Sequence, residues 1–308
     1  MKRSAPALAA LLLAALGSWL AFGGGGSSSA DYTPFARCPL AERATDLCLY
    51  SRASGGELTV GSRTIPLSRP VVFQGGVHVI ENARREVVHE RFIAPIRGPA
   101  LSLASQPVPG GLRGALDQNL LGRALRARLR RYLAAGSAAN TLTITIELAA
   151  PVSTISLDIQ NLIERSGIAL TLPVKVGLSN PFLQSSCHVD TGAHPGAHPL
   201  YIGSDAHPIA LALTTGTTDP PAPNRPVRGR VANTSVKDDY NVTAIGASSL
   251  VNNSFAAPTV HGCAGAQSPA LERALDTGLG LPAPAGVNTA ILQGALSDAN
   301  APAVRAHR

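Results

Sequence analysis

Short stretches in which apolar and polar residues alternate recur along the chain, and a period of two is typical of half-buried strands. The clearest stretch follows Asn140, where Leu142, Ile144 and Ile146 alternate with threonines. Glycine, proline and asparagine separate the predicted strands, which span residues 57–60, 64–67, 71–80, 86–93, 141–146, 168–178, 209–215, 227–235, 240–245, 249–255 and 287–296. This pattern predicts a mainly β fold, an antiparallel β-sandwich or barrel-like domain. Pro173 predicts that its stretch is an edge strand or contains a bulge.

One long segment, residues 112–135, has the period of an amphipathic helix. Its apolar stripe consists of Leu121, Leu125, Leu129 and Tyr132. Its basic face consists of Arg123, Arg126 and Arg130. Such a helix either packs its leucines against a sheet or lies on an anionic membrane surface. Packing is favoured, because Arg128 interrupts the apolar side. Two short helices are predicted at residues 158–165 and 268–278.

The first thirty residues have the layout of a secretory signal peptide. Lys2 and Arg3 precede an apolar run at residues 7–22, and Ser28 and Ala30 occupy the −3 and −1 positions of a cleavage site. Cleavage after Ala30 predicts a secreted or cell-surface-associated protein. The alternative is a retained membrane anchor, although the run is shorter than the roughly 20 residues that a spanning helix needs. No later stretch approaches that length, so no transmembrane segment is expected after cleavage.

The breaker-rich residues 106–111 are the best internal boundary in the remaining chain. The predicted parts are an N-terminal β segment, a helical connection and a C-terminal β-rich segment, at residues 31–108, 109–139 and 140–297. The polar residues 298–308 are predicted to form a flexible tail. The alternative is that residues 31–297 form one compact domain, for which they are long enough.

The chain is basic, with a formal charge of +7 that becomes +5 once Lys2 and Arg3 leave with the signal peptide. This mild excess favours an anionic surface such as a phosphate-rich wall polymer, or it marks a basic surface without a partner. Aromatic residues make up 4% of the chain and form no array with basic residues. Nucleic-acid binding, which uses such arrays, is therefore not expected. The expected partner is a cell-wall polymer or another extracellular protein.

Four cysteines follow the signal peptide, and an even number outside the cytoplasm indicates disulfides. Three connectivities exist for four cysteines, and we predict Cys38–Cys48 and Cys187–Cys263. The first closes a short loop, and the second joins two β segments of the C-terminal half. A structural zinc site is not expected, because no two cysteines form a C-x2-C pair.

Familiar catalytic and cofactor motifs are missing: the sequence contains no G-x-S-x-G, no G-x-x-x-x-G-K and no H-E-x-x-H. We therefore expect no cofactor. A histidine-rich stretch that repeats Ala-His-Pro supplies the only candidate metal ligands, His188, His194, His198 and His207. Imidazoles bind zinc, copper or nickel. The alternative is a duplicated surface loop, because prolines keep the stretch extended and the rings need not converge.

Several segments of the C-terminal half resemble a family of uncharacterised secreted actinobacterial proteins without an assigned activity. These segments are residues 172–176, 180–187, 214–224, 249–258 and 262–263. The resemblance implies export and a β-rich extracellular domain, and it implies no catalytic residue.

Two functions are consistent with these observations. The export signal, the strand pattern and the missing catalytic motifs predict a secreted non-enzymatic protein of the cell envelope or extracellular space, acting as a binding or structural module. The alternative is an extracellular hydrolase with an unrecognised site, assisted by a metal ion at the histidine-rich stretch. No catalytic residue is identified for it.

Overall fold

The computed structural model describes residues 31–84, 86–164, 167–187, 200–215, 236–239, 242–263 and 268–308. Its strands are β1 (Leu47–Val60), β2 (Arg63–Pro66), β3 (Val71–Glu81), β4 (Val87–Ile93), β5 (Leu101–Leu103), β6 (Gln106–Pro107), β7 (Thr143–Leu148), β8 (Ser156–Leu157), β9 (Leu170–Ser179), β10 (Leu200–Ile202), β11 (Ile209–Thr215), β12 (Val236–Asp239), β13 (Val242–Asn252), β14 (Val260–His261) and β15 (Thr289–Asn300). Its α-helices are α1 (Gly111–Ala115), α2 (Arg123–Leu133), α3 (Ile159–Glu164), α4 (Pro181–Ser186), α5 (Ser268–Leu279) and α6 (Ala301–Ala306). Short 3-10 helices are η2 (Thr33–Phe35), η3 (Gln118–Leu120), η4 (Ser137–Asn140) and η5 (Val152–Thr154).

The strands form one antiparallel sheet whose pairings close into a ring. Around this ring each strand pairs with the next in the order β1, β3, β4, β8, β9, β11, β13 and β15, and β15 pairs with β1. Two joints are short, because β4 meets β8 through Arg91 and Ser156, and β11 meets β13 through Thr214 and Thr215. The fold is therefore mainly antiparallel β and barrel-like, which confirms the predicted fold class.

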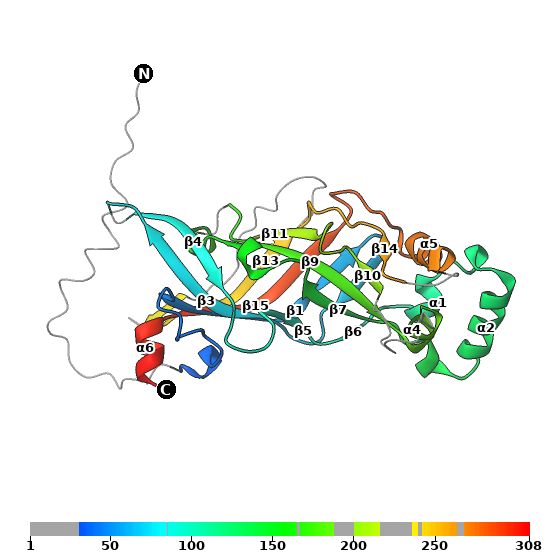
Figure 1. The fold of residues 1–308 in the computed structure, drawn as a ribbon, viewed down its shortest axis with the longest axis horizontal. Helices are drawn as coiled ribbons and strands as arrows, with labels where there is room; N and C mark the ends of the chain where they lie inside the picture. Colours follow the sequence, from blue (N-terminus) through cyan, green and yellow to red (C-terminus); the bar gives the residue numbers. More distant parts are fainter. Residues whose placement is uncertain are drawn as a thin grey trace, which may run out of the picture.

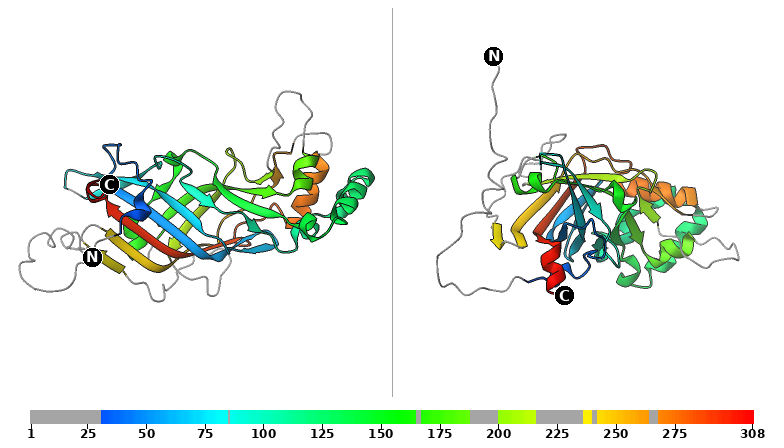
Figure 2. Two further views of the ribbon diagram at one scale, coloured as in Figure 1. Left: turned by 90° about the horizontal axis from the view of Figure 1, so that it is seen from below. Right: turned by 60° about the vertical axis from the view of Figure 1, so that its left-hand side comes forward.

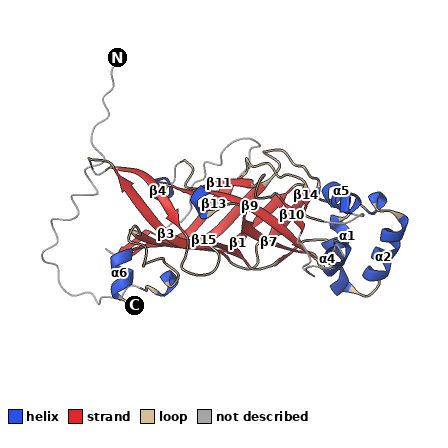
Figure 3. Ribbon diagram, in the orientation of Figure 1, coloured by secondary structure: helices blue, strands red, loops and turns tan. Residues whose placement is uncertain are grey.

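Five of the six α-helices lie at the ends of this elongated arrangement, and α3 lies beside β11. In Figure 1, α1, α2, α4 and α5 lie beyond one end of the strands, and α6 lies near the other end. The secondary-structure colouring of Figure 3 shows the same helices at the two ends of the strands. Seen from below in Figure 2, α2 remains at the extremity of the molecule. The helix-bearing end and the α6 end therefore offer different surfaces to a partner.

One hydrophobic cluster includes side chains from both predicted β segments. Val77 of β3, Leu213 of β11 and Leu271 of α5 belong to it and are fully buried. A cavity of about 20 Å³ remains between β1, β3, β5, β9, β13 and β15, with room for about one water molecule. The inside of the barrel is thus a packed core rather than a ligand chamber.

β9 has partners on both sides, so of the two alternatives predicted from Pro173, an edge strand or a bulge, the edge strand is wrong. Pro173 pairs with Ala210 of β11 on one side, and its carbonyl accepts the Ala149 N–H at 2.9 Å on the other. On that second side, β7 leaves β9 at Val174 and β8 joins it at Thr171. The position of the absent proline N–H therefore faces the gap between β7 and β8, where no ladder hydrogen bond is lost.

The helix predicted at residues 112–135 is interrupted between α1 and α2. Leu116 is extended after α1, with φ −114° and ψ 125°. The Asp117 carboxylate then accepts the Asn119 N–H at 3.0 Å and caps η3. This side-chain bond gives the backbone an alternative to a continuous helix. The predicted helices at 158–165 and 268–278 correspond to α3 and α5.

The strands predicted at residues 240–245 and 249–255 are one strand, β13, in the structure. A register shift against β15 between Ile245 and Ser248 marks the place where the sequence pattern breaks. A bulge of this kind changes which face later residues occupy without ending the strand. The strand predicted at residues 227–235 lies outside the described residues.

The C-terminal residues 298–308 are folded, which corrects the prediction of a flexible tail. β15 continues to Asn300, and α6 follows it directly. Ala301 and Val304 of α6 are buried in a second hydrophobic cluster with Phe35 and the Cys38–Cys48 disulfide. Two buried residues are too few to form a recognisable sequence pattern. The residues of the N-terminal segment that they pack against lie more than two hundred positions away.

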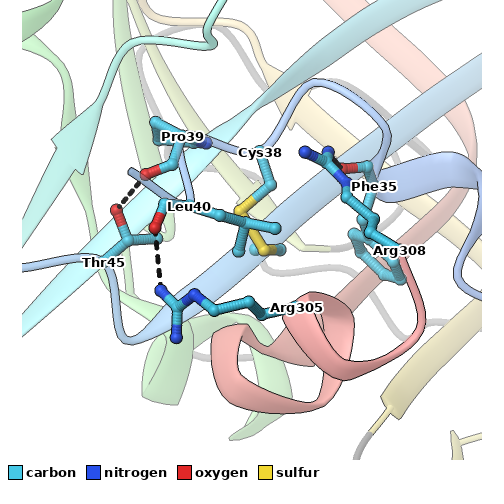
Figure 4. Close-up of a disulfide and its surroundings, with 8 residues drawn as sticks. Phe35, Cys38, Pro39, Leu40, Thr45, Arg305 and Arg308 are labelled. Carbon is cyan, nitrogen blue, oxygen red and sulfur yellow. Dashed lines mark hydrogen bonds between the residues drawn. A yellow bond between two sulfur atoms is a disulfide. The ribbon is translucent and has the colours of Figure 1, made fainter. Parts of the chain in front are cut away.

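Hydrogen bonds hold α6 against the N-terminal segment (Figure 4). Arg305 Nη2 donates to the Leu40 carbonyl and Arg308 Nη2 donates to the Phe35 carbonyl, each at 2.8 Å. The buried Thr45 hydroxyl donates to the Pro39 carbonyl at 2.9 Å. The two ends of the described chain therefore stabilise each other.

Asp276 on α5 is expected to control a pH-dependent part of the stability. Burial raises the pKa of its carboxyl group, although Oδ1 accepts the Val260 N–H at 2.7 Å. Because the folded-state pKa is raised, this group favours folding at low pH, and that contribution is lost as pH rises through the folded-state pKa. Asp276→Asn keeps the acceptor without the charge, so we expect it to gain stability over the wild type at about pH 7 but not at about pH 3.

Asp276→Ala is the matched comparison, because it also removes the acceptor for the Val260 N–H. We expect it to cost roughly 1–3 kcal/mol at both pH values in urea unfolding. An asparagine variant as unstable as the alanine variant would contradict this role of Asp276.

Candidate functional site

The predicted histidine cluster is only partly described by the structure. His207 lies in the turn between β10 and β11, where its side chain is exposed and its N–H donates to Ser204 Oγ at 2.9 Å. His188, His194 and His198 lie outside the described residues. Among the residues that are described, no three metal-ligating side chains come together. The metal site therefore stays a prediction.

Interacting ionisable side chains form a row across β7, β9, β10 and the turn after β10. Lys175 Nζ lies 3.0 Å from Asp205 Oδ1 and 4.8 Å from the centre of the Tyr201 ring. The Tyr201 hydroxyl donates to Glu147 Oε2 at 3.2 Å. Burial, with the nearby Glu147 charge, raises the pKa of Tyr201 to about 12. The phenol therefore stays protonated at neutral pH, and these mutual contacts stabilise the sheet rather than expose a reactive group.

The four predicted disulfide cysteines are joined as expected, Cys38 to Cys48 and Cys187 to Cys263. The first bond is buried at the α6 end. The second joins the end of α4 to the segment after β14, near the helix-bearing end. Each disulfide therefore anchors a different end of the barrel.

Helix α2 presents a dense basic surface. Leu125, Leu129 and Leu133 are buried, which confirms that the apolar stripe packs against the protein. The exposed side of α2 carries Arg123, Arg128, Arg130 and Arg131. No acidic residue occurs anywhere in the helix. The surface is therefore cationic along its whole length.

The arginines of α2 divide into two groups by their contacts. Arg126 donates to the carbonyls of Asn119 and Leu121, and Arg128 donates to Ser185 Oγ at 2.8 Å. By contrast, the side chains of Arg123, Arg130 and Arg131 form no hydrogen bond or ion pair with other described residues.

Two helical turns, about 10.5 Å along the axis, separate Arg123 from Arg130. The unpaired guanidinium groups are thus spaced along one helix and available to anions. The acid-free run of arginines is visible in the sequence and indicates a basic surface. Which arginines reach solvent is known only once the packing of the leucines is known.

Within the described residues, no helix is both long and apolar enough to cross a membrane. No family model, curated protein or solved structure matches the chain. The functional argument therefore rests on the surfaces of the molecule itself.

Proposed function

We propose that this chain is a secreted, non-enzymatic β-rich binding module of the cell envelope or extracellular space. Its partner is a polymer with repeated negative charges, such as a phosphate-rich wall polymer, and its contact surface is α2. The single observation that carries this proposal is the exposed, acid-free arginine surface at one extremity of the molecule.

Four further features support export and the choice of partner. Residues 1–30 have the pattern of a signal peptide, and two disulfides suit an oxidising compartment. Guanidinium groups form paired hydrogen bonds with phosphate and carboxylate oxygens. The buried leucines of α2 leave no apolar stripe to enter a bilayer, which favours a polyanionic polymer over a lipid surface.

Binding to isolated actinobacterial cell walls tests this proposal. We expect the purified protein to pellet with walls at low salt and to be released as salt screens the charges. The triple variant Arg123→Gln, Arg130→Gln and Arg131→Gln is expected to bind about tenfold more weakly or worse. Its folding is expected to be unchanged, because these three side chains have no described intramolecular partner.

The matched control removes the same charge at the other end of the molecule, through Arg84→Gln, Arg91→Gln and Arg97→Gln. These three arginines are also exposed, on and near β4. Equal losses in both triple variants would show that net charge, not α2, drives binding. Wild-type protein that stays in the supernatant would exclude wall binding, and stronger pelleting with anionic lipid vesicles than with walls would favour a membrane partner instead.

A further inference from the structure

A hollow of about 830 Å³, with six polar side chains in its lining, lies on the outer face of β1, β13 and β15, apart from α2. The register aligns its lining: Tyr50 lies opposite Ser297, and Arg52 lies opposite Ala295. On the other side of β15, Ser249 of β13 lies opposite Gln293, which also lines the hollow. Strand pairing therefore fixes these side chains on one face.

The hollow exists because small residues interrupt a row of larger side chains. Gly55, Gly294 and Ala295 provide little side-chain bulk at its floor. The register of β1 against β15 also shifts between Ala53 and Gly55, and such a bulge bends the strand. Pro34 of η2 forms part of the rim.

The polar side chains of the hollow are not used by the fold. Tyr50, Arg52, Ser54, Ser249, Gln293 and Ser297 line it. Among the described residues, none of these side chains has a hydrogen-bond or ion-pair partner. By contrast, the buried amides of Gln106, Asn180 and Asn288 each bond several backbone groups. These three amides serve the fold, whereas the side-chain donors and acceptors of the hollow have no partner among the described residues.

Arg52 gives the hollow its charge, since it is the one ionisable cation among the lining residues. A planar guanidinium binds a carboxylate through two parallel hydrogen bonds. The serine hydroxyls and the Gln293 amide match the hydroxyl groups of a sugar, because each can donate and accept. Tyr50 adds an aromatic ring that is held in place against the second hydrophobic cluster.

We propose that this hollow binds a short oligosaccharide that carries a carboxylate group. Its volume lies within the range of about 300–1,000 Å³ that small-ligand sites occupy. Arg52 pairs with the carboxylate, the hydroxyl and amide groups bond the sugar hydroxyls, and the Tyr50 ring contacts an apolar sugar face. The site does not depend on the proposed role of α2.

Calorimetric titration of the purified protein with a galacturonic acid tetramer tests the proposal, with a glucose tetramer as the uncharged probe. We expect the acidic tetramer to bind about tenfold more tightly than the glucose tetramer. Arg52→Gln is expected to abolish that preference. Ala295→Trp, which fills the hollow from an exposed position, is expected to remove binding of both probes.

The matched control Arg84→Gln is expected to bind the acidic tetramer as the wild type does. Equal affinity of Arg52→Gln and wild type for the acidic tetramer would overturn the proposal. Displacement of the tetramer by an equal concentration of inorganic phosphate would also overturn it, by showing an anion site without sugar recognition. Thermal unfolding of each variant separates loss of the site from loss of the fold.

Discussion

Replacing Asn288 with alanine is expected to destabilise the protein by roughly 3–5 kcal/mol, because buried polar groups would lose their partner. The Asn288 side chain is fully buried, and its Oδ1 accepts the Gly61 N–H at 2.8 Å. Its Nδ2 group lies within hydrogen-bond distance of the carbonyls of Phe255, Ala283 and Pro284. One amide thus joins the β1–β2 turn, the segment after β13 and the loop before β15. Urea unfolding followed by circular dichroism measures the loss.

Two further variants test whether the loss of stability comes from the Asn288 amide itself or from a change at a neighbouring position. Thr289→Ala changes the adjacent, half-buried residue, which has no described side-chain partner, and is expected to cost less than about 1 kcal/mol. Asn288→Asp keeps an acceptor but places a charge in the core, so we expect it to be as harmful as alanine at neutral pH. An alanine variant within 1 kcal/mol of the wild type would show that water replaces the amide.

Removing the Cys187–Cys263 disulfide is expected to lower stability by roughly 4 kcal/mol, and removing Cys38–Cys48 by about 2 to 3 kcal/mol. The difference arises because the sequence separations are 76 and 10, and a longer closed loop restricts the unfolded chain more. Melting temperatures of the two paired variants measure this order.

Alanine pairs are the appropriate variants for this comparison. Cys38 and Cys48 are both buried in the second hydrophobic cluster, where a serine hydroxyl would add a desolvation cost unrelated to the cross-link. Cys263 is only half-buried, so the same cost is smaller there. A lower melting temperature for Cys38→Ala with Cys48→Ala than for the Cys187 and Cys263 pair would show that local packing outweighs loop length.

The local strand pattern predicted much of the fold because the alternation of side chains is a property of neighbouring residues. The stretch at 209–215 coincides with β11, and the stretches at 64–67 and 71–80 correspond to β2 and β3. The disulfide pairing was also predicted correctly, because compartment and spacing restrict it. Two predictions were wrong, the edge position of Pro173 and the flexibility of residues 298–308. Both features depend on contacts with residues that are distant in the sequence.

The two candidate surfaces, α2 and the hollow, also differ in how much of each could be predicted from the sequence. The arginines of α2 are visible as a basic face in the sequence, but only the burial of Leu125, Leu129 and Leu133 shows which side reaches solvent. The hollow gave no sequence signal at all. Its residues come from η2, β1, β13 and β15, which are separate in the chain, and a bulge must be placed before the faces of the strands are known.

By itself, the sequence determined the strand-rich class of this protein, its basic charge, its disulfides and the amphipathic character of α2. Each of these depends on composition, spacing or the contact of a residue with near neighbours. The tertiary structure alone decided how the ring closes, that α6 packs on the N-terminal segment, and that Arg52 shares a hollow with hydroxyl and amide groups that have no partner among the described residues. These features depend on register and on long-range packing, which the order of residues along one strand does not contain.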